Sequence, residues 1–316
     1  MQEPLTRGRF APTPSGYVHV GNAFCYFLSW LSAHQKGGGV VLRMEDTDLM
    51  RMMPEMYGQT MDDLLWLGLT WDAGPTPEGG GQDYLQSNRT SIYEALYEEL
   101  RRRDLIYPCF CTRSDLKNAC APHASDGHSI YPGTCAHLTA AEREEKARTR
   151  SPAWRLRTPD KTIHLRDGLQ GDLSLNLTAE CGDYPIRRAD GVFCYQFVSV
   201  VDDALMGVNE VVRSRDLLPS TPQQIGLQEL LGYPRPRYYH IPMILDAQGN
   251  RMAKRDRGLS IAGLRQTYAP EEVLGRLAFL AGQQETPRAR TLSEILADFD
   301  WAKLPREDIP LPDGLF

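Results

Sequence analysis

The chain carries, close to its start, the sequence Arg9-Phe10-Ala11-Pro12-Thr13-Pro14-Ser15-Gly16-Tyr17-Val18-His19-Val20-Gly21-Asn22. Its first residues are typical of a short strand, the Pro/Ser/Gly run predicts a turn, and His-x-Gly opens an amphipathic helix. Backbone N–H groups at the start of a helix form an anion site, and glycine lets a ligand approach the backbone closely. Taken alone, the pattern is as typical of a tight turn with a surface histidine as of a binding site.

The strand-and-helix pattern continues beyond this stretch. Residues 40–45 follow the glycines 37–39 and are typical of a buried strand, and apolar residues at helical spacing cover 54–67 and 87–103. Elements that alternate at this spacing predict βαβ units and a parallel sheet. From Asp104 to about Arg187 the sequence changes to short strands, Pro/Gly turns and clustered cysteines, which indicates an insertion.

The alternating pattern resumes after the insertion. It is carried by Tyr195–Val201, a helix at Thr221–Leu231, a strand at Ile241–Leu245, and helices at Pro270–Gln283 and Leu292–Phe299. The chain contains no internal repeat and no low-complexity tract.

Composition limits the class of protein. The 316 residues are enough for one large domain with an insertion, and the apolar and charged fractions are those of a soluble globular protein. The start of the chain does not resemble a signal sequence, and the best apolar run, 23–33, is too short to span a bilayer. Seven cysteines at uneven spacing favour a reducing cytoplasm over a disulfide framework. The net charge is −6, so the chain does not have the overall basic character that is typical of a nucleic-acid-binding protein.

Three motifs follow the first in order: Arg43-Met44-Glu45-Asp46-Thr47-Asp48, Val201-Asp202-Asp203 and Arg251-Met252-Ala253-Lys254-Arg255. With them the chain resembles the class I aminoacyl-tRNA synthetases of the glutamyl type. His19-Val20-Gly21-Asn22 fills the "HIGH" motif and Lys254 the second lysine of "KMSKS". Arg251 replaces the first lysine of that motif and Ala253 its serine, so loop closure over ATP is expected to be weaker than in typical relatives.

The resemblance implies an α/β fold. The expected architecture is a Rossmann-like doubly wound parallel sheet, an inserted zinc-containing α+β subdomain and a short helical C-terminal region. The corresponding divisions are a first catalytic half at 1–103, the insertion at 104–186, a second catalytic half at 187–262 and the helical region at 263–316.

A free glutamate presents two carboxylates and one ammonium group. Arg9 and Arg213 are the candidates for the carboxylates, because a guanidinium matches a carboxylate bidentately. Glu45, expected at the carboxyl end of its strand, is the candidate for the ammonium group, and Tyr195 supplies a hydroxyl and a flat wall. The residues by themselves leave Glu45 open as a salt-bridge partner and Arg213 as a surface cation. The resemblance assigns glutamate binding to a set that also includes Phe10, Ala11, Pro12 and Thr13.

The nucleotide half of the reaction needs positioned charge rather than a covalent nucleophile, because the substrate carboxylate attacks ATP itself. His19 and Lys254 are the predicted catalytic residues. The resemblance implies ATP contacts from Pro12, His19, Gly21, Asn22, Arg251 and Lys254, with Mg²⁺ accompanying the ATP. Asp202 and Asp203 are expected to hold the architecture rather than to do chemistry.

The insertion contains a Cys-x-Cys pair, Cys109 and Cys111, followed by Tyr131 and Cys135. Free buried cysteines are the alternative to a zinc site, because the pair is closer than in the usual zinc knuckle. The resemblance implies one structural zinc held by Cys109, Cys111, Tyr131 and Cys135, although nearby Cys120, His123, His128 and His137 offer substitute ligands. Cys25, Cys181 and Cys194 are expected to lie in the core.

Only about fifty residues follow Gly263, so no anticodon-binding domain is expected. The chain is in this respect similar to a shortened branch of the family that transfers glutamate to queuosine at the wobble position of tRNA(Asp). The resemblance therefore implies ATP, L-glutamate and queuosine-containing tRNA(Asp) as partners of a cytoplasmic monomer, away from membranes. Two alternatives stay open: a truncated synthetase that charges a tRNA 3′ end, and a non-catalytic module that binds glutamyl-adenylate or tRNA.

Overall fold

The computed structural model describes residues 5–112, 114–116, 130–246, 248–250 and 257–316. Its first unit is β1 (Arg7–Phe10), α1 (Val20–Gln35) and β2 (Gly39–Leu42), in which the two strands pair in parallel from Arg7↔Gly39 to Phe10↔Leu42. The return from α1 to β2 depends on glycine. Gly37 has φ +65°, and a Cβ on Gly38 would lie 1.9 Å from the carbonyl oxygen of Thr6.

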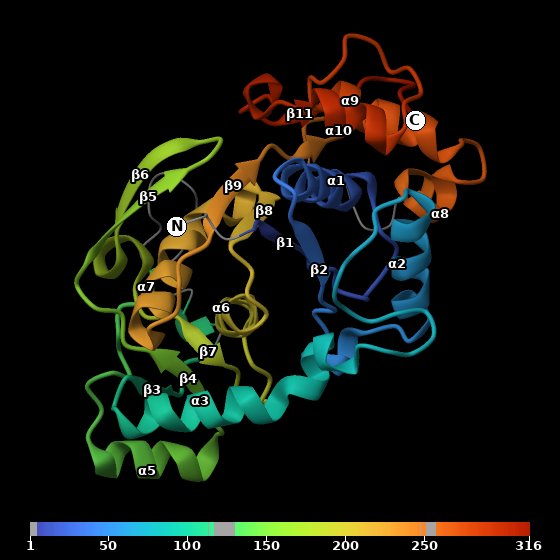
Figure 1. Cartoon of the computed structure of the whole chain (residues 1–316). Coiled ribbons are helices and arrows are strands. Elements are labelled where there is room, and N and C mark those ends of the chain that lie inside the picture. The colour runs from blue at the N-terminus through green and yellow to red at the C-terminus, as the bar shows by residue number, and fades with distance from the viewer. Residues whose placement is uncertain (1–4, 113, 117–129, 247, 251–256) are drawn as a thin grey trace.

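The second parallel unit lies next to the first (Figure 1). Strands β8 (Glu210–Ser214) and β9 (Arg237–Ile241) pair in parallel, and the N–H of Asn209 donates to the carbonyl of Arg7 at 3.0 Å, beside the start of β1. Helices α6 (Tyr195–Leu205) and α7 (Thr221–Leu231) belong to this half of the chain. The parallel pairs agree with the alternating pattern, and the arrangement is the Rossmann-like α/β fold that the resemblance implies.

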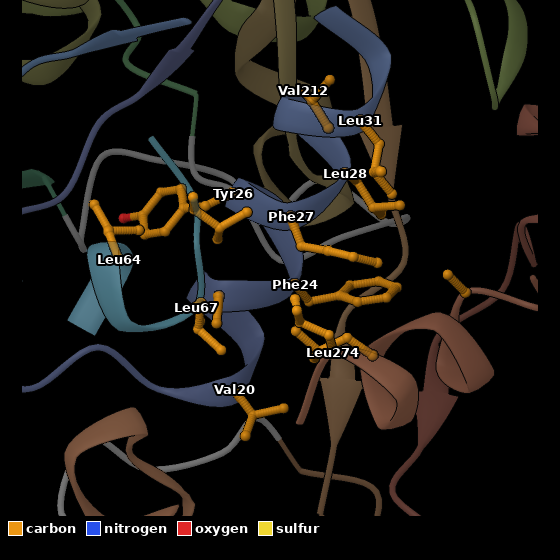
Figure 2. Close-up of a cluster of buried hydrophobic side chains, with 14 of the residues drawn as sticks. Val20, Phe24, Tyr26, Phe27, Leu28, Leu31, Leu64, Leu67, Val212 and Leu274 are labelled. Carbon is orange, nitrogen blue, oxygen red and sulfur yellow. The ribbon is translucent and has the colours of Figure 1, made fainter. Parts of the chain in front are cut away.

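Helix α1 packs on strands β1, β2 and β8, and its apolar side chains form much of the core. Figure 2 shows Leu64 of α2 (Glu55–Trp66) on one side of α1 and Leu274 of α9 (Pro270–Leu280) on the other. Phe27 and Leu28 of α1 are completely buried. Each such side chain contributes roughly 1.5–3 kcal/mol by leaving water.

The connection from β2 to the insertion is helical, as expected. Helix α2 matches the predicted 54–67, and α3 (Thr90–Arg102) lies within the predicted 87–103. The short helices of this part are η1 (Leu49–Arg51), η2 (Gln82–Tyr84) and η3 (Gln86–Arg89). The strand predicted at 40–45 is shorter than expected, since β2 ends at Leu42 and Met44 forms only an isolated bridge with Leu85.

The segment predicted as an insertion contains strands and a helix, in two packing groups. One group is an antiparallel sheet in the order β3 (Ile106–Cys109), β4 (Ala153–Leu156), β7 (Pro185–Arg187), with α5 (Ala140–Thr149) nearby in the chain. The other is the hairpin β5 (Thr162–Asp167) and β6 (Gly171–Asn176), followed by η4 (Leu177–Cys181).

The hairpin packs against α7 and β9 rather than standing apart from the catalytic half. Ile163 and Leu165 of β5 lie in the same buried cluster as Val211 of β8 and Tyr238 of β9. Part of the predicted insertion therefore belongs to the core around the parallel strands, because the alternate apolar residues of β5 need that surface to leave water.

Two later elements differ from the sequence prediction. The strand predicted at Ile241–Leu245 is interrupted: β9 ends at Ile241, and β10 (Ile244–Leu245) pairs instead with β11 (Ile309–Pro310). Pro242 explains the break, because proline has no N–H for a ladder hydrogen bond. The apolar run Tyr195–Val201 forms the first part of helix α6.

The C-terminal part is helical, as predicted. After α9 it contains α10 (Leu292–Asp298) and η7 (Trp301–Lys303). The remaining short helices lie before it: η5 (Arg215–Ser220) connects β8 to α7, and η6 (Arg257–Leu259) and α8 (Ile261–Leu264) precede α9. Among the residues that the structure describes, no helix combines the length and the apolar character needed to cross a membrane.

Candidate active site and metal site

A cavity of about 480 Å³, here called the main cavity, lies among the described residues. Residues that follow β1 and β2, the end of β8 and the residues after β9 all contribute to it. Ligands in α/β sheets collect at this edge, where the carboxyl ends of the strands meet. The predicted site residues that line it are Arg9, Ala11, Thr13, His19, Gly21, Asn22, Glu45, Tyr195 and Arg213.

The two candidate arginines are buried at the main cavity, each 5% exposed. Arg9 Nη1 donates to the carbonyl of Val212 at 2.8 Å, and its Nε lies 3.8 Å from Asp203 Oδ1. Arg213 Nη1 donates to Tyr195 Oη at 3.2 Å. The alternative that Arg213 is a surface cation is wrong, because its side chain lies inside the protein.

Glu45 is both a salt-bridge partner and a wall of the main cavity. Its Oε1 lies 3.1 Å from Nη2 of Arg43, a completely buried arginine whose Nη1 lies 2.6 Å from Asp203 Oδ1. Burial raises the pKa of Glu45, against the opposing charges of Arg43 and Arg9. A positively charged group bound in the main cavity would favour the ionised form of Glu45.

Asp202 and Asp203 hold this arrangement from α6. Asp202 is completely buried and accepts hydrogen bonds from Gln86 Nε2 at 2.8 Å, Arg89 Nε at 2.7 Å and Tyr93 Oη at 2.7 Å. These contacts join α6 to η3 and α3, which agrees with the architectural role expected for the Asp-Asp pair.

His19 marks the start of α1 at the main cavity. It is the N-cap residue of the helix, is 7% exposed, and forms an isolated bridge with Ser260. Gly21 and Asn22 line the main cavity from the first turn, where backbone N–H groups have no partner within the helix. Pro12 lines a smaller neighbouring hollow of about 100 Å³, together with Asn22 and Tyr26.

Two sequence assignments change with the structure. The ring of Phe10 is completely buried and packs against Tyr26 with ring centroids 5.4 Å apart, so its side chain serves the core rather than a ligand. Cys25, expected in the core, lines the main cavity, and burial raises the pKa of its thiol to about 12. Arg251 and Lys254 lie outside the described residues.

Sequence reasoning missed the residues that surround Arg213. His240 and Gln224 both bond to its guanidinium, and Asp167 bonds to His240. Asp167 and His240 are 73 positions apart and on separate strands, and neither belongs to a motif. No signal in the sequence joins them.

The second candidate site is a cluster of three cysteines and a tyrosine. The sulfur atoms of Cys109, Cys111 and Cys135 all lie within 4.8 Å of one another, and the Cys111–Cys135 separation is 3.6 Å. Tyr131 Oη lies 3.4 Å from Cys109 Sγ and 3.6 Å from Cys111 Sγ. Tetrahedral zinc with Zn–S bonds of about 2.3 Å places its sulfur ligands about 3.8 Å apart, so the donor set fits zinc.

The electrostatics of this cluster differ between the two cysteines of the Cys-x-Cys pair. Burial raises the pKa of Cys111 to about 12, and neighbouring Cys109 adds to the effect. For Cys109 burial acts in the same direction, but hydrogen bonds from Tyr131 and the backbone of Cys111 outweigh it and lower the pKa. A divalent cation would hold all three sulfurs as thiolates. Of the alternative ligands, Cys120, His123 and His128 lie outside the described residues.

Residues 6–300 match the model of the class I tRNA synthetases (E and Q), catalytic domain. The chain belongs to this family. A member of the tRNA synthetases of class I is a ligase, and the Rossmann-like fold agrees with the family's catalytic domain.

Relatives within the family have two kinds of name. A protein of Nitratidesulfovibrio vulgaris named glutamyl-Q tRNA(Asp) synthetase is 44% identical, over 98% of this chain and 96% of its own length. A protein of Alkalilimnicola ehrlichii named glutamate–tRNA ligase 2 is 43% identical, over 86% of this chain but 58% of its own length. The solved structure of a glutamate tRNA ligase from Elizabethkingia meningosepticum, in complex with its amino acid, is 26% identical with a TM-score of 0.82. That match covers 99% of this chain and 68% of the other.

Proposed function

We propose that this chain activates L-glutamate with ATP and transfers the glutamyl group to queuosine at the wobble position of tRNA(Asp). The names of the relatives support glutamate and tRNA as substrates. Three relatives named glutamyl-Q tRNA(Asp) synthetase align with this chain over 93–96% of their own length, which favours queuosine as the acceptor.

The observation that carries the proposal is the charge arrangement of the main cavity. Two buried arginines, Arg9 and Arg213, and one half-buried carboxylate, Glu45, whose side chain is 11% exposed, line the same space of about 480 Å³. This set complements the two carboxylates and the ammonium group of free glutamate. A neutral glutamine side chain would leave one guanidinium without its anionic partner, so this set of residues would select glutamate over glutamine.

His19 and the first turn of α1 would face the phosphates of ATP, because the positive end of the helix dipole lies at the main cavity. Lys254 and Arg251 lie outside the described residues but precede Ser260, which pairs with His19, by six and nine positions. We assign both to phosphate binding, and His19 and Lys254 to charge stabilisation in the transition state. Mg²⁺ would arrive with ATP and neutralise part of the triphosphate charge.

The reaction then proceeds in two steps. A carboxylate oxygen of glutamate attacks the α-phosphorus of ATP, the bond to the bridging oxygen breaks, and pyrophosphate leaves with that electron pair. A hydroxyl oxygen of the queuosine cyclopentenediol next attacks the acyl carbon of the adenylate, loses its proton, and AMP leaves. The chain's own contribution is to position the reactants and to stabilise charge on phosphate.

We also propose that Cys109, Cys111, Tyr131 and Cys135 hold one structural zinc. The separations of their sulfur and hydroxyl atoms support it. The metal would tie β3, which ends at Cys109, to the segment that contains Tyr131 and Cys135. It contributes to folding of this part of the chain rather than to the transfer itself.

The proposal is tested in two assays on the whole chain. Glutamate-dependent pyrophosphate exchange with Mg-ATP and no tRNA measures activation, and exchange no higher than background would favour the non-catalytic alternative. Transfer of labelled glutamate is then compared for tRNA(Asp) with queuosine, tRNA(Asp) without queuosine, and tRNA(Glu). We expect transfer only to the first.

Removal of the 3′-terminal adenosine separates the remaining alternatives. Transfer to queuosine survives this trimming, whereas charging of a tRNA 3′ end requires the missing ribose. Loss of transfer after trimming would overturn the queuosine proposal and favour a truncated synthetase that charges a tRNA 3′ end.

A further inference from the structure

The guanidinium of Arg213 is held by four hydrogen bonds from its own surroundings. Nε donates to His240 Nε2 at 3.0 Å, Nη1 to Gln224 Oε1 at 2.7 Å and to Tyr195 Oη at 3.2 Å, and Nη2 to Thr221 Oγ1 at 2.9 Å. A guanidinium has five N–H groups, so these contacts use four of them. Contacts with the described residues therefore orient the Arg213 side chain before any ligand binds.

The contact with Arg213 determines the state of His240. Arginine only donates, so His240 Nε2 has to accept and its proton has to lie on Nδ1. Nδ1 is 2.6 Å from Asp167 Oδ2, to which it donates. Burial and the charge of Arg213 lower the pKa of His240 to about 4, against the attraction of Asp167, so the ring is neutral at physiological pH.

Asp167 is fixed in turn by the hairpin β5–β6. Its Oδ1 accepts from the backbone N–H groups of Leu169 at 3.0 Å and Gln170 at 2.8 Å. Gln170 Nε2 donates to the carbonyl of His240 at 2.8 Å, which attaches the turn to the end of β9. Asp167, His240 and Arg213 are 3%, 0% and 5% exposed, so water competes little for these bonds.

We propose that Asp167 and His240 are positioning residues for Arg213. They hold its guanidinium toward the main cavity by selecting one neutral tautomer of the imidazole, and thereby set the affinity for an anionic group of the substrate. This inference rests on the proposed role of Arg213 in binding a glutamate carboxylate. It makes the hairpin β5–β6 part of the amino-acid site, although the turn residues Leu169 and Gln170 do not line the main cavity.

Two variants of nearly equal polarity separate positioning from packing. In His240→Gln the amide oxygen can replace Nε2 and accept from Arg213, whereas in His240→Asn the shorter amide reaches only the position of Nδ1. We expect His240→Asn to raise the KM for glutamate in pyrophosphate exchange about ten- to a hundredfold, the equivalent of one lost hydrogen bond to a charged group. His240→Gln should raise it less than about threefold, and the KM for ATP should stay within about twofold in both.

Asp167→Asn tests the tautomer. Oδ1 accepts from the backbone N–H groups of Leu169 and Gln170 and shares that of His240 with Oδ2, so Oδ1 is the position that must stay an acceptor. The variant's amide nitrogen therefore takes the position of Oδ2 and donates to His240 Nδ1. The imidazole proton then moves to Nε2, where it faces the N–H of Arg213, so two donors meet and the hydrogen bond between them is lost. We expect a rise in the KM for glutamate at least as large as that of His240→Asn.

The imidazole ¹⁵N shifts of labelled protein give a readout that does not depend on activity. The His240 signal, identified by its absence from His240→Gln, should show a proton on Nδ1 in the unmodified chain and on Nε2 in Asp167→Asn. A proton on Nε2 in the unmodified chain, or equal KM values for His240→Gln and His240→Asn, would overturn the inference. Absence of glutamate-dependent exchange in the unmodified chain would instead overturn the proposed function, and the ¹⁵N shifts would still decide the tautomer.

Discussion

Asp63 lies on α2 with its side chain completely buried and poorly paired. Its Oδ1 accepts from Gln59 Nε2 at 2.8 Å and is 3.8 Å from Arg265 Nη1, while Oδ2 has no hydrogen-bond partner among the described residues. Burial is the main reason that the pKa of Asp63 is raised from 3.8 to about 6. The folded protein consequently holds a proton on Asp63 that the unfolded chain has already released.

The direction of the pH effect follows from this difference. Between about pH 3.8 and pH 6 the folded state binds more protons at Asp63 than the unfolded state, so its contribution to stability is lost as the pH rises through that window. At 1.36 kcal/mol for each pKa unit, the ionised group costs the folded state about 3 kcal/mol at pH 7. Asp63→Asn cannot ionise and keeps an oxygen for Gln59, and the attraction of Arg265 for the ionised group is already included in the pKa difference. We therefore expect the variant to be about 2–3 kcal/mol more stable at pH 7.

Urea unfolding of the unmodified chain and of Asp63→Asn, at pH values from 4 to 7.5, measures the difference in free energy of unfolding. The difference should be near zero at pH 4 and should reach its full value above pH 6. Asp62→Asn is the matched control, because Asp62 is the exposed neighbour on the same helix and its substitution should change stability by less than about 0.5 kcal/mol. A difference that is absent at pH 7, or that does not depend on pH, would refute the reasoning.

Three further predictions concern the sites and the core. In pyrophosphate exchange, kcat/KM for glutamine should be lower than for glutamate by a factor that corresponds to about 2–5 kcal/mol of activation free energy, because Arg9 or Arg213 would lack its anionic partner. Equal values of kcat/KM for the two amino acids would show that the arginines do not have this role. Cys111→Ser should lower the zinc content from about one ion per chain, measured by elemental analysis, whereas Cys25→Ser should leave it unchanged; an unmodified chain without zinc would contradict the site. Leu28→Ala, at a completely buried position of α1, should lower the free energy of unfolding by about 2–5 kcal/mol in urea, and a loss below 1 kcal/mol would show that the core refills the space.

The local elements were largely predictable, because apolar spacing reports which face of an element is buried. Helices α2, α3, α7, α9 and α10 lie where the 3.6-residue pattern predicts them. The predictions failed where one residue altered the backbone pairing, as at Pro242. They also failed at the run Tyr195–Val201, which the strand-and-helix pattern places ahead of a helix and which itself forms the start of helix α6, because a short apolar run suits a buried strand and a buried helix equally.

The sequence by itself determined the family motifs and the chemical character of the site, because guanidinium, carboxylate and hydroxyl groups at given positions restrict what can bind. It identified Arg9, Glu45 and Arg213 as candidates to bind the charged groups of a ligand. Only the tertiary structure decided that all three line one cavity, that Glu45 also pairs with Arg43, and that Asp167 on a separate hairpin bonds to His240, which in turn bonds to Arg213. The physical reason is that a buried polar group must find partners, and which partners it meets depends on strands far apart in the chain that no local pattern connects.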